Sequence, residues 1–313
     1  MVTIWSDMAD VLDEAAALCI DGISEHDRVR RHPVSHADFD KAAFVEDFGS
    51  KRPAQWLSQA IGYYLADCAY ELRALGTLLR LEIVGATLEV LVRAILERVG
   101  RISWLLDLEP EDALDDAETT RHRAVRASFE ALVSAQTYRR GVEMIRADKD
   151  QQKRVAVIER DFREVIRAWF EVVQPSTDPE NPNSLDATAN TWTIDGEHYP
   201  NYLELAEWAI AGGTISAPVA KGTYAALSGW SHPNFIAATE HRATDQSYAY
   251  NFDFLQRLLQ LALFGYLKAF KAWSGYYEFN ADEFDERCDQ IAAVWEATTP
   301  NMALDPFETE EST

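Results

Sequence analysis

Apolar residues in the first third of the chain recur at the spacing of one face of an α-helix, and this spacing limits the fold more than any other feature. The residues fall at positions i, i+4, i+7, i+11, i+14 and i+18: Ile61, Leu65, Cys68, Leu72, Leu75 and Leu79. The pattern predicts a long helix that begins at Pro53 and buries one face. The next segment, about 83–107, is apolar around much of its circumference. It therefore predicts a helix at the centre of a bundle.

The same periodicity predicts helices through most of the remaining chain, over about 150–173, 201–212, 216–232, 249–276 and 281–297. Prolines and turn-forming residues predict an irregular connection over 174–200. Within it, Asp195-Gly196 between β-prone residues predicts a small hairpin. We therefore predict an all-α helical bundle. Residues 1–298 are expected to form a single helical domain, with a subdivision near 174–200 as the open alternative, and 299–313 an acidic tail.

The charge of the chain is strongly negative but unevenly distributed. The net charge of −23 over 313 residues disfavours non-specific attraction to phosphate backbones and anionic lipid. Residues 121–167, however, contain 12 Lys or Arg against 7 Asp or Glu. We interpret this stretch as solvated helix faces with i,i+4 partners such as Glu159–Arg163. The alternative is a basic surface that binds RNA or a nucleotide.

Neither the start of the chain nor its apolar stretches predict targeting to a membrane. The first twenty residues have no basic segment, and acidic residues interrupt each apolar run, unlike a signal peptide. The longest apolar stretch, 258–267, is too short to span a bilayer and predicts a buried core helix. We therefore expect a cytoplasmic protein with no membrane partner. Cys19, Cys68 and Cys288 are far apart without a CxxC motif, which predicts buried structural thiols.

The segment YAALSGWSHPN, residues 224–234, places Tyr224, Ser228 and His232 four residues apart on one helical face, just before Pro233. An imidazole near a helix C-terminus meets the negative end of the helix dipole, which favours its protonated form. Such a histidine suits acid–base chemistry or phosphate binding. The competing interpretation is a structural histidine that caps the end of a buried helix.

Arg93 and Glu97 lie four residues apart at the edge of the apolar arc of the predicted central helix, which predicts an ion pair. Charged groups so close to a buried face need partners, because an unpaired buried charge is costly. We expect these partners to come from another helix, with Tyr224, Ser228 and His232 as the candidates.

This combination resembles a group of uncharacterised bacterial helical proteins associated with the HEPN (higher eukaryotes and prokaryotes nucleotide-binding) superfamily. The matching residues are Arg93, Glu97, Tyr224, Leu227, Ser228 and His232. The resemblance covers about residues 60–270 in outline and depends on short motifs. It implies a helical bundle, dimerisation and, for some relatives, metal-independent RNA cleavage or a role in a toxin or defence system.

The chain departs from active HEPN ribonucleases, which have an arginine four to six residues before the histidine. No arginine stands in that window before His232. The spacing does occur at Arg31 and His36, but Pro33 lies between them and the segment lacks apolar periodicity, which predicts a loop. If the chain cleaves RNA, His232 would be the general acid/base and Arg93 would stabilise the developing phosphorane charge.

The sequence has no P-loop, dinucleotide-binding, zinc-protease or nucleophile-elbow motif, so we predict no cofactor. His26, His32 and His36, near Asp27 and Asp38, do not have the spacing of a metal site, and we predict none. The predicted function is a non-catalytic interaction or regulatory protein of a toxin or defence type, with a protein partner or a second copy of the chain.

The alternative function is a metal-independent ribonuclease or nucleotide-binding enzyme. In that case the catalytic residues are His232 and Arg93, and the binding residues are Glu97, Tyr224 and Ser228.

Overall fold

The computed structural model describes residues 2–28, 35–83, 86–106, 116–145, 148–174, 191–211, 216–231, 252–278 and 280–299. Across these residues the fold is all-α, as predicted, with one small three-stranded sheet. The chain divides into two compact units. Unit 1 comprises Met1–His32, Gly62–Ser103 and Tyr202–Thr313, and unit 2 comprises Pro33–Ile61 and Trp104–Asn201. The single domain over 1–298 stays a prediction. The predicted acidic tail lies outside the described residues beyond Thr299.

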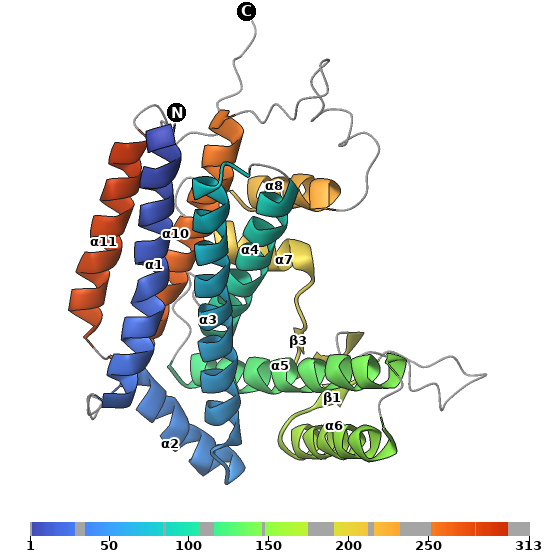
Figure 1. Ribbon diagram of the computed structural model, residues 1–313. Helices are drawn as coiled ribbons and strands as arrows, with labels where there is room; N and C mark the ends of the chain where they lie inside the picture. The colour runs from blue at the N-terminus through green and yellow to red at the C-terminus, as the bar shows by residue number, and fades with distance from the viewer. Residues whose placement is uncertain are drawn as a thin grey trace, which may run out of the picture. The chain divides into compact units, whose positions relative to one another are not determined.

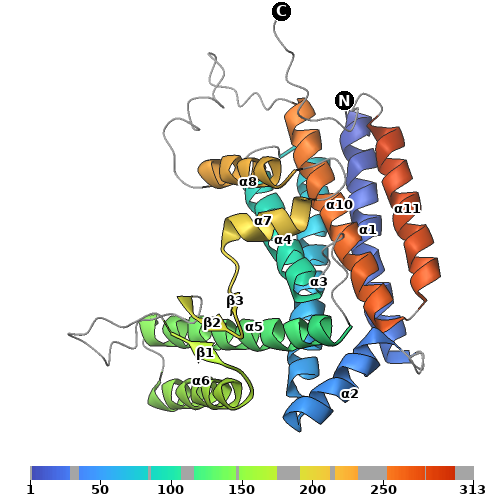
Figure 2. The ribbon, with the colours of Figure 1, turned by 180° about the vertical axis from the view of Figure 1, so that it is seen from behind.

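Unit 1 contains α1 (Val2–Arg28), α7 (Tyr202–Ile210), α8 (Ala217–Ser231), α10 (Phe252–Tyr277) and α11 (Ala281–Thr298), with most of α3 (Arg52–Arg80) and α4 (Ala86–Leu106). Helix α1 packs against α10 and α11, and the three lie side by side in Figures 1 and 2. Helix α7 packs against α8 and α10. The apolar stretch 258–267 lies within α10 and contributes mostly buried residues, as predicted.

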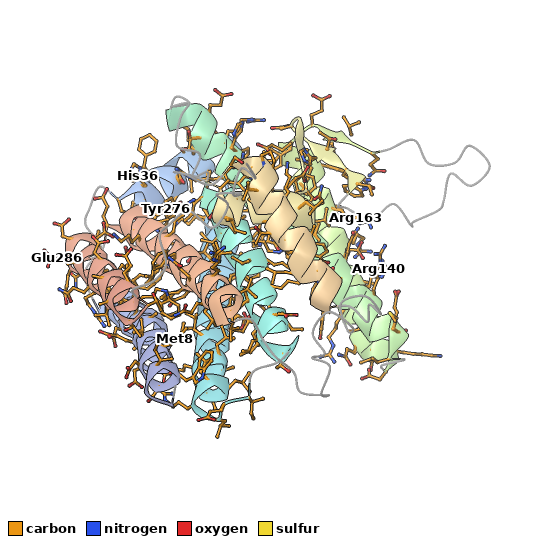
Figure 3. The ribbon with its side chains drawn as sticks, turned by 90° about the horizontal axis from the view of Figure 1, so that it is seen from above. Met8, His36, Arg140, Arg163, Tyr276 and Glu286 are labelled. Carbon is orange, nitrogen blue, oxygen red and sulfur yellow. The ribbon has the colours of Figure 1, made fainter. Side chains whose placement is uncertain are left out.

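The core of unit 1 follows the apolar periodicity of the sequence. The predicted stripe of α3 is fully buried: Leu65, Cys68, Leu72, Leu75 and Leu79 belong to unit 1, and Ile61 is the last residue of the part of α3 in unit 2. Helix α4 buries apolar side chains on much of its circumference, which confirms its predicted central place. Met8 of α1 is fully buried and Tyr276 of α10 is nearly so; both are labelled in Figure 3.

The three cysteines are free and buried, as predicted. Burial raises the pKa of the Cys19 thiol to about 11 and that of the Cys288 thiol to about 12. The pKa of Cys68 is also raised by burial, and its thiol lies 3.9 Å from the carbonyl oxygen of Ile95. The cysteines therefore act as small apolar side chains of the core.

Unit 2 contains α2 (His36–Phe48), α5 (Asp116–Met144), α6 (Lys149–Trp169) and the strands β1 (Val172–Val173), β2 (Thr193–Ile194) and β3 (Glu197–His198). The antiparallel sheet has the order β1-β2-β3. The predicted hairpin is present between β2 and β3, where Asp195 and Gly196 have φ values of 49° and 82°. Two successive positive φ values are typical of the tight turns that join such strands. The connecting residues 175–190 lie outside the described residues.

Helices α5 and α6 pack against each other as a helical hairpin, which both ribbon views show (Figures 1 and 2). Aromatic contacts hold α6 to the start of α3: the ring centroids of Trp56 and Phe162 are 5.1 Å apart. Directly after β3, the hydroxyl of Tyr199 donates a hydrogen bond of 2.8 Å to Glu130 of α5. The hairpin is thus fixed within unit 2 at its sides, while its end extends away from these contacts.

The predicted end of one helix was wrong. The helix expected over 150–173 ends at Trp169, because Phe170 is extended and Val172–Val173 pair with β2. Of the loop expected over 31–36, only Ser35 and His36 are described: Ser35 is the N-cap that accepts a hydrogen bond from the Asp38 amide, and α2 begins at His36. Arg31 and Pro33 lie outside the described residues.

Candidate functional site

Three of the predicted site residues meet within unit 1. The Nε of Arg93 donates hydrogen bonds to Glu97 Oε1 at 2.8 Å and to the Tyr224 hydroxyl at 3.0 Å. The Tyr224 hydroxyl in turn donates to the same Glu97 oxygen at 2.5 Å. The three side chains form a closed triangle that joins α4 to α8, which we call the Arg93 triangle. The predicted ion pair is confirmed, and so is its expected partner on another helix.

A fourth residue, which the sequence did not point to, completes this cluster. The Tyr202 ring of α7 stacks on the Tyr224 ring, with centroids 6.4 Å apart and an interplanar angle of 16°. The Arg93 guanidinium carbon lies 5.9 Å from the Tyr202 ring centroid and 5.4 Å from that of Tyr224. Tyr224 is 3% exposed whereas Tyr202 is 52% exposed. The cluster therefore runs from a buried hydroxyl to an exposed aromatic ring.

A glycine on α4 allows α7 to lie close to this cluster. A Cβ at Gly100 would be 2.1 Å from the Leu205 carbonyl oxygen, closer than any side chain tolerates. Because Gly100 is less than one turn beyond Glu97, it brings the backbone of α7 against the same part of α4. Helix α8 packs against α7, so Tyr224 and Tyr202 both reach Arg93.

The electrostatics of the triangle keep the tyrosine neutral and the arginine charged. Burial raises the pKa of Tyr224 strongly, and its hydrogen bond to Glu97 raises it further. Burial alone would lower the pKa of Arg93, but its hydrogen bonds to Glu97 and Tyr224 outweigh that effect and raise it. Tyr224 therefore stays neutral and Arg93 stays charged across the physiological pH range.

Of the remaining predicted site residues, the structure describes some and not others. Ser228 lies in α8, one turn after Tyr224, and is half-buried. Leu227 is fully buried and belongs to the core rather than to the polar cluster. His232, the predicted acid/base, lies outside the described residues. The catalytic role of His232 and Arg93, and the binding role of Glu97, Tyr224 and Ser228, stay predictions.

A second polar group, also missed from the sequence, joins α3 to α4. Arg98 pairs with Glu71 at 2.8 Å and with Asp67 at 3.3 Å. The other carboxylate oxygen of Glu71 is buried and has no hydrogen-bond partner among the described residues. Burial raises the pKa of Glu71 to about 7; Arg98 opposes this rise, and the charges of Asp67 and Glu97 add to it. Glu71 thus holds a proton in a large fraction of molecules at neutral pH.

The sequence contained a signal for this second group. Asp67 and Glu71 are four residues apart and flank the buried Cys68 and Leu72, so both stand at the edge of an apolar face. The same argument that selected Arg93 and Glu97 on α4 applies to them. No comparable signal marked Tyr202, because its position depends on how α7 crosses α4.

The basic stretch 121–167 lies in unit 2, and much of its charge is neutralised internally. Arg123 pairs with the buried Asp40 at 3.1 Å, and Arg126 pairs with Glu197 at 2.9 Å. The buried carboxylate of Glu159 accepts hydrogen bonds from three side chains: Gln136, Arg139 and Arg163. Figure 3 labels Arg163 of α6 and Arg140 of α5. The predicted pair Glu159–Arg163 is confirmed.

Two further predictions concern metal ions and membranes. Across those residues, no group of three or more His, Cys, Asp or Glu side chains is arranged to hold a metal ion. His36 lies at the start of α2, whereas the side chains of His26 and His32 are outside the described set. None of the described helices is both long enough and apolar enough to cross a membrane.

The Arg93 triangle can fasten α8 to α4, and beside it the exposed Tyr202 presents an aromatic ring close to the Arg93 guanidinium. The chain was compared with models of known protein families, with curated proteins and with solved structures, and none of these comparisons found a match.

Proposed function

We propose that the chain is a non-catalytic interaction or regulatory protein of the HEPN-like type, in which the Arg93 triangle locks α8 onto α4. One observation carries this proposal. The Nε of Arg93, the Tyr224 hydroxyl and Glu97 Oε1 are hydrogen-bonded to one another, and Tyr224 is almost fully buried. A substrate that used these atoms would have to break the bonds between the two helices. Satisfied buried networks of this kind specify one packing arrangement.

The charge distribution supports the same proposal. A polyanion such as RNA would meet a chain of net charge −23, and several arginines of the basic stretch are already paired with carboxylates. Binding through phosphate contacts depends on cations that are free to replace counterions. Because Arg123, Arg126 and Arg139 are in ion pairs, fewer cations of this stretch are free to contact phosphates.

A double-mutant cycle on Arg93→Lys and Tyr224→Phe tests the lock. Unfolding by urea of the wild type, both single variants and the double variant gives the coupling free energy between the two side chains. We expect a coupling of about 0.5–3 kcal/mol, the range for residues in one network. A coupling free energy of zero would contradict the proposal that the triangle locks α8 onto α4.

The same proteins would be incubated with labelled single-stranded RNA without added metal. We expect the RNA to stay intact with every variant. Cleavage by the wild type that is lost in a His232→Ala variant with an unchanged melting temperature would overturn the non-catalytic proposal.

Metal-independent acid–base chemistry on RNA or a nucleotide is the second candidate, and Glu71 is the observation that favours it. A carboxyl group with a pKa near the working pH is suited to proton transfer. Glu71 has such a pKa, about 7, and the charge of Glu97 contributes to it. In this case Arg93 would hold the anion, His232 would share the proton transfer, and Tyr202 would stack on a base.

A further inference from the structure

The end of the α5–α6 hairpin differs from the rest of unit 2 in its charge. Four of its cations are exposed: Arg140, Lys149, Lys153 and Arg154. Within the described residues none of these four takes part in an ion pair. Three acidic residues, Glu143, Asp148 and Asp150, lie among them, and Glu143 pairs with Arg139. Asp148 is occupied as the N-cap of α6, because it accepts from the amides of Asp150 and Gln151.

The same end of the hairpin also exposes apolar side chains. Met144 is 84% exposed, Ile145 is 74% exposed and Tyr138 is 56% exposed. All three lie in the last two turns of α5 or directly after it, next to the start of α6 (Figure 1). We call residues 138–145 and 149–154 the hairpin tip. Single exposed apolar residues are ordinary, but several together beside charged residues mark an interaction site.

We propose that the hairpin tip binds an acidic polypeptide segment that also carries apolar side chains. The proposal rests on the proposed function as an interaction protein, and names the chemistry of its partner. Carboxylates of the partner would pair with the four cations, and its apolar side chains would cover Met144 and Ile145. Methionine, aromatic residues and arginine are enriched in protein interfaces, and the tip has all three.

A polypeptide fits the tip better than a nucleic acid does, for two reasons. The bases of a nucleic acid stack on aromatic rings rather than on the aliphatic side chains of Met144 and Ile145, whereas leucine or phenylalanine of an acidic segment can cover both. A nucleic acid is also a long polyanion, so it would extend beyond the tip into the field of a chain of net charge −23. A short acidic segment needs only the local positive charge, because salt screens charges beyond about 8–10 Å.

The test measures fluorescence anisotropy of a fluorescein-labelled synthetic peptide of about 14 residues, built from glutamate with leucine and phenylalanine at every third or fourth position. We expect it to bind the full chain, and added salt to weaken the binding. A variant with Arg140→Glu and Lys153→Glu should bind at least 10-fold more weakly, as should a variant with Met144→Ser and Ile145→Ser. The matched control has Lys51→Glu and Arg73→Glu, two exposed cations outside the tip, and should bind as the wild type does.

Three results would overturn the proposal: no binding by the wild type, equal losses in the tip and control variants, or tighter binding of a single-stranded oligonucleotide than of the peptide at the tip. A peptide whose leucines and phenylalanines are replaced by serine separates the apolar contribution from simple charge attraction. The peptide assay and the RNA assay are independent of each other. If the RNA stays intact and the peptide does not bind, the binding role of the hairpin tip is rejected and the proposed function is not. Cleavage of RNA that depends on His232 rejects the proposed function instead.

Discussion

Gly100 of α4 and Leu205 of α7 approach so closely that no side chain can be accommodated between their backbones: a Cβ at position 100 would be 2.1 Å from the Leu205 carbonyl oxygen. The contact brings α7 against α4 less than one turn from Glu97. It is the reason that Tyr202 lies within reach of Arg93.

Replacing this glycine should therefore move α7 or prevent its packing. We expect Gly100→Ala to lower the free energy of unfolding by about 2–4 kcal/mol, since the Leu205 backbone cannot yield as a flexible side chain would. Gly222→Ala on α8 is the matched control, because a Cβ there meets nothing within 4 Å. Alanine should stabilise that helix by up to about 1 kcal/mol. Urea unfolding of both variants measures the difference, and equal stabilities would contradict the close approach.

Removal of the Tyr224 hydroxyl should weaken the Arg93 triangle without opening a cavity. We expect Tyr224→Phe to cost about 1–2 kcal/mol of unfolding free energy, because Arg93 and Glu97 each lose a buried hydrogen-bond partner. Tyr202→Phe keeps the stacked ring at an exposed position and should change stability by less than about 0.5 kcal/mol. Thermal unfolding compares the two; a larger loss in the Tyr202 variant would contradict the assignment.

Glu71 should make stability depend on pH near neutrality. Its folded pKa of about 7 lies above its ordinary value of 4.5, so the folded state binds more protons between these values. The stability that Glu71 contributes in its protonated form is complete below about pH 4.5 and is lost as the pH rises through 7. Glu71→Gln keeps an oxygen for Arg98 but cannot ionise. We expect this variant to match the wild type at pH 5 and to exceed it by about 1–3 kcal/mol at pH 8.

Melting temperatures of the wild type and Glu71→Gln across pH 5–8 check this expectation. Asp67→Asn is a second test, because the charge of Asp67 adds to the raised pKa of Glu71. The stability of this variant should change less steeply between pH 5 and 8 than that of the wild type. A constant difference between Glu71→Gln and the wild type at every pH would contradict a raised pKa.

The contribution of Glu159 to stability should depend on pH in the opposite direction to that of Glu71. Burial favours its neutral form, but the hydrogen bonds and charges of Arg139 and Arg163 outweigh burial and lower the pKa. Glu159→Gln should cost about 2–4 kcal/mol at pH 7, because two arginines lose a buried carboxylate. The stability that Glu159 contributes is present above its unfolded pKa and is lost as the pH falls through the folded value. The gap between variant and wild type should therefore narrow in acid.

The control for Glu159 is Glu164→Gln, which removes an exposed carboxylate 3.8 Å from Arg160. Such surface pairs contribute less than about 1 kcal/mol. Urea unfolding at pH 7 and pH 4 distinguishes the two variants.

The buried thiols should be chemically silent in the folded protein. The pKa values of Cys19 and Cys288 are raised to about 11 and about 12, so almost no thiolate is present at pH 8. We expect a thiol reagent such as Ellman's reagent to label none of the three cysteines in buffer and all three in denaturant. Rapid labelling of any cysteine in the folded state would contradict its burial.

The parts of this fold that depend on local apolar periodicity could be predicted. The stripe from Ile61 to Leu79 and the broad apolar surface of α4 both reached the core as expected. Helix α2 was missed because its buried side chains include Asp40, which pairs with Arg123 far along the chain. No local pattern reveals that a carboxylate will be buried by a distant arginine.

The candidate site also combines residues that could be predicted from the local sequence with residues that could not. Arg93, Glu97 and Tyr224 could be selected because charged residues at the edge of an apolar arc require partners. Tyr202 could not be selected, because it depends on the α4–α7 crossing at Gly100. Glu71 shows a third case: its position was readable from the sequence, but its raised pKa follows from burial beside Asp67 and Glu97 in the folded chain.

The order of segments along the chain has a consequence for protein synthesis. The last segment of unit 2 ends at Asn201, whereas α1 packs against α10 and α11, which end at Tyr277 and Thr298. At translation rates of roughly 5–20 residues per second, the side of α1 that packs against α10 and α11 stays uncovered for roughly 5–20 s after Asn201 is made. We expect unit 2 to fold on the ribosome first, and chaperones to bind this side of α1 until the final helix emerges.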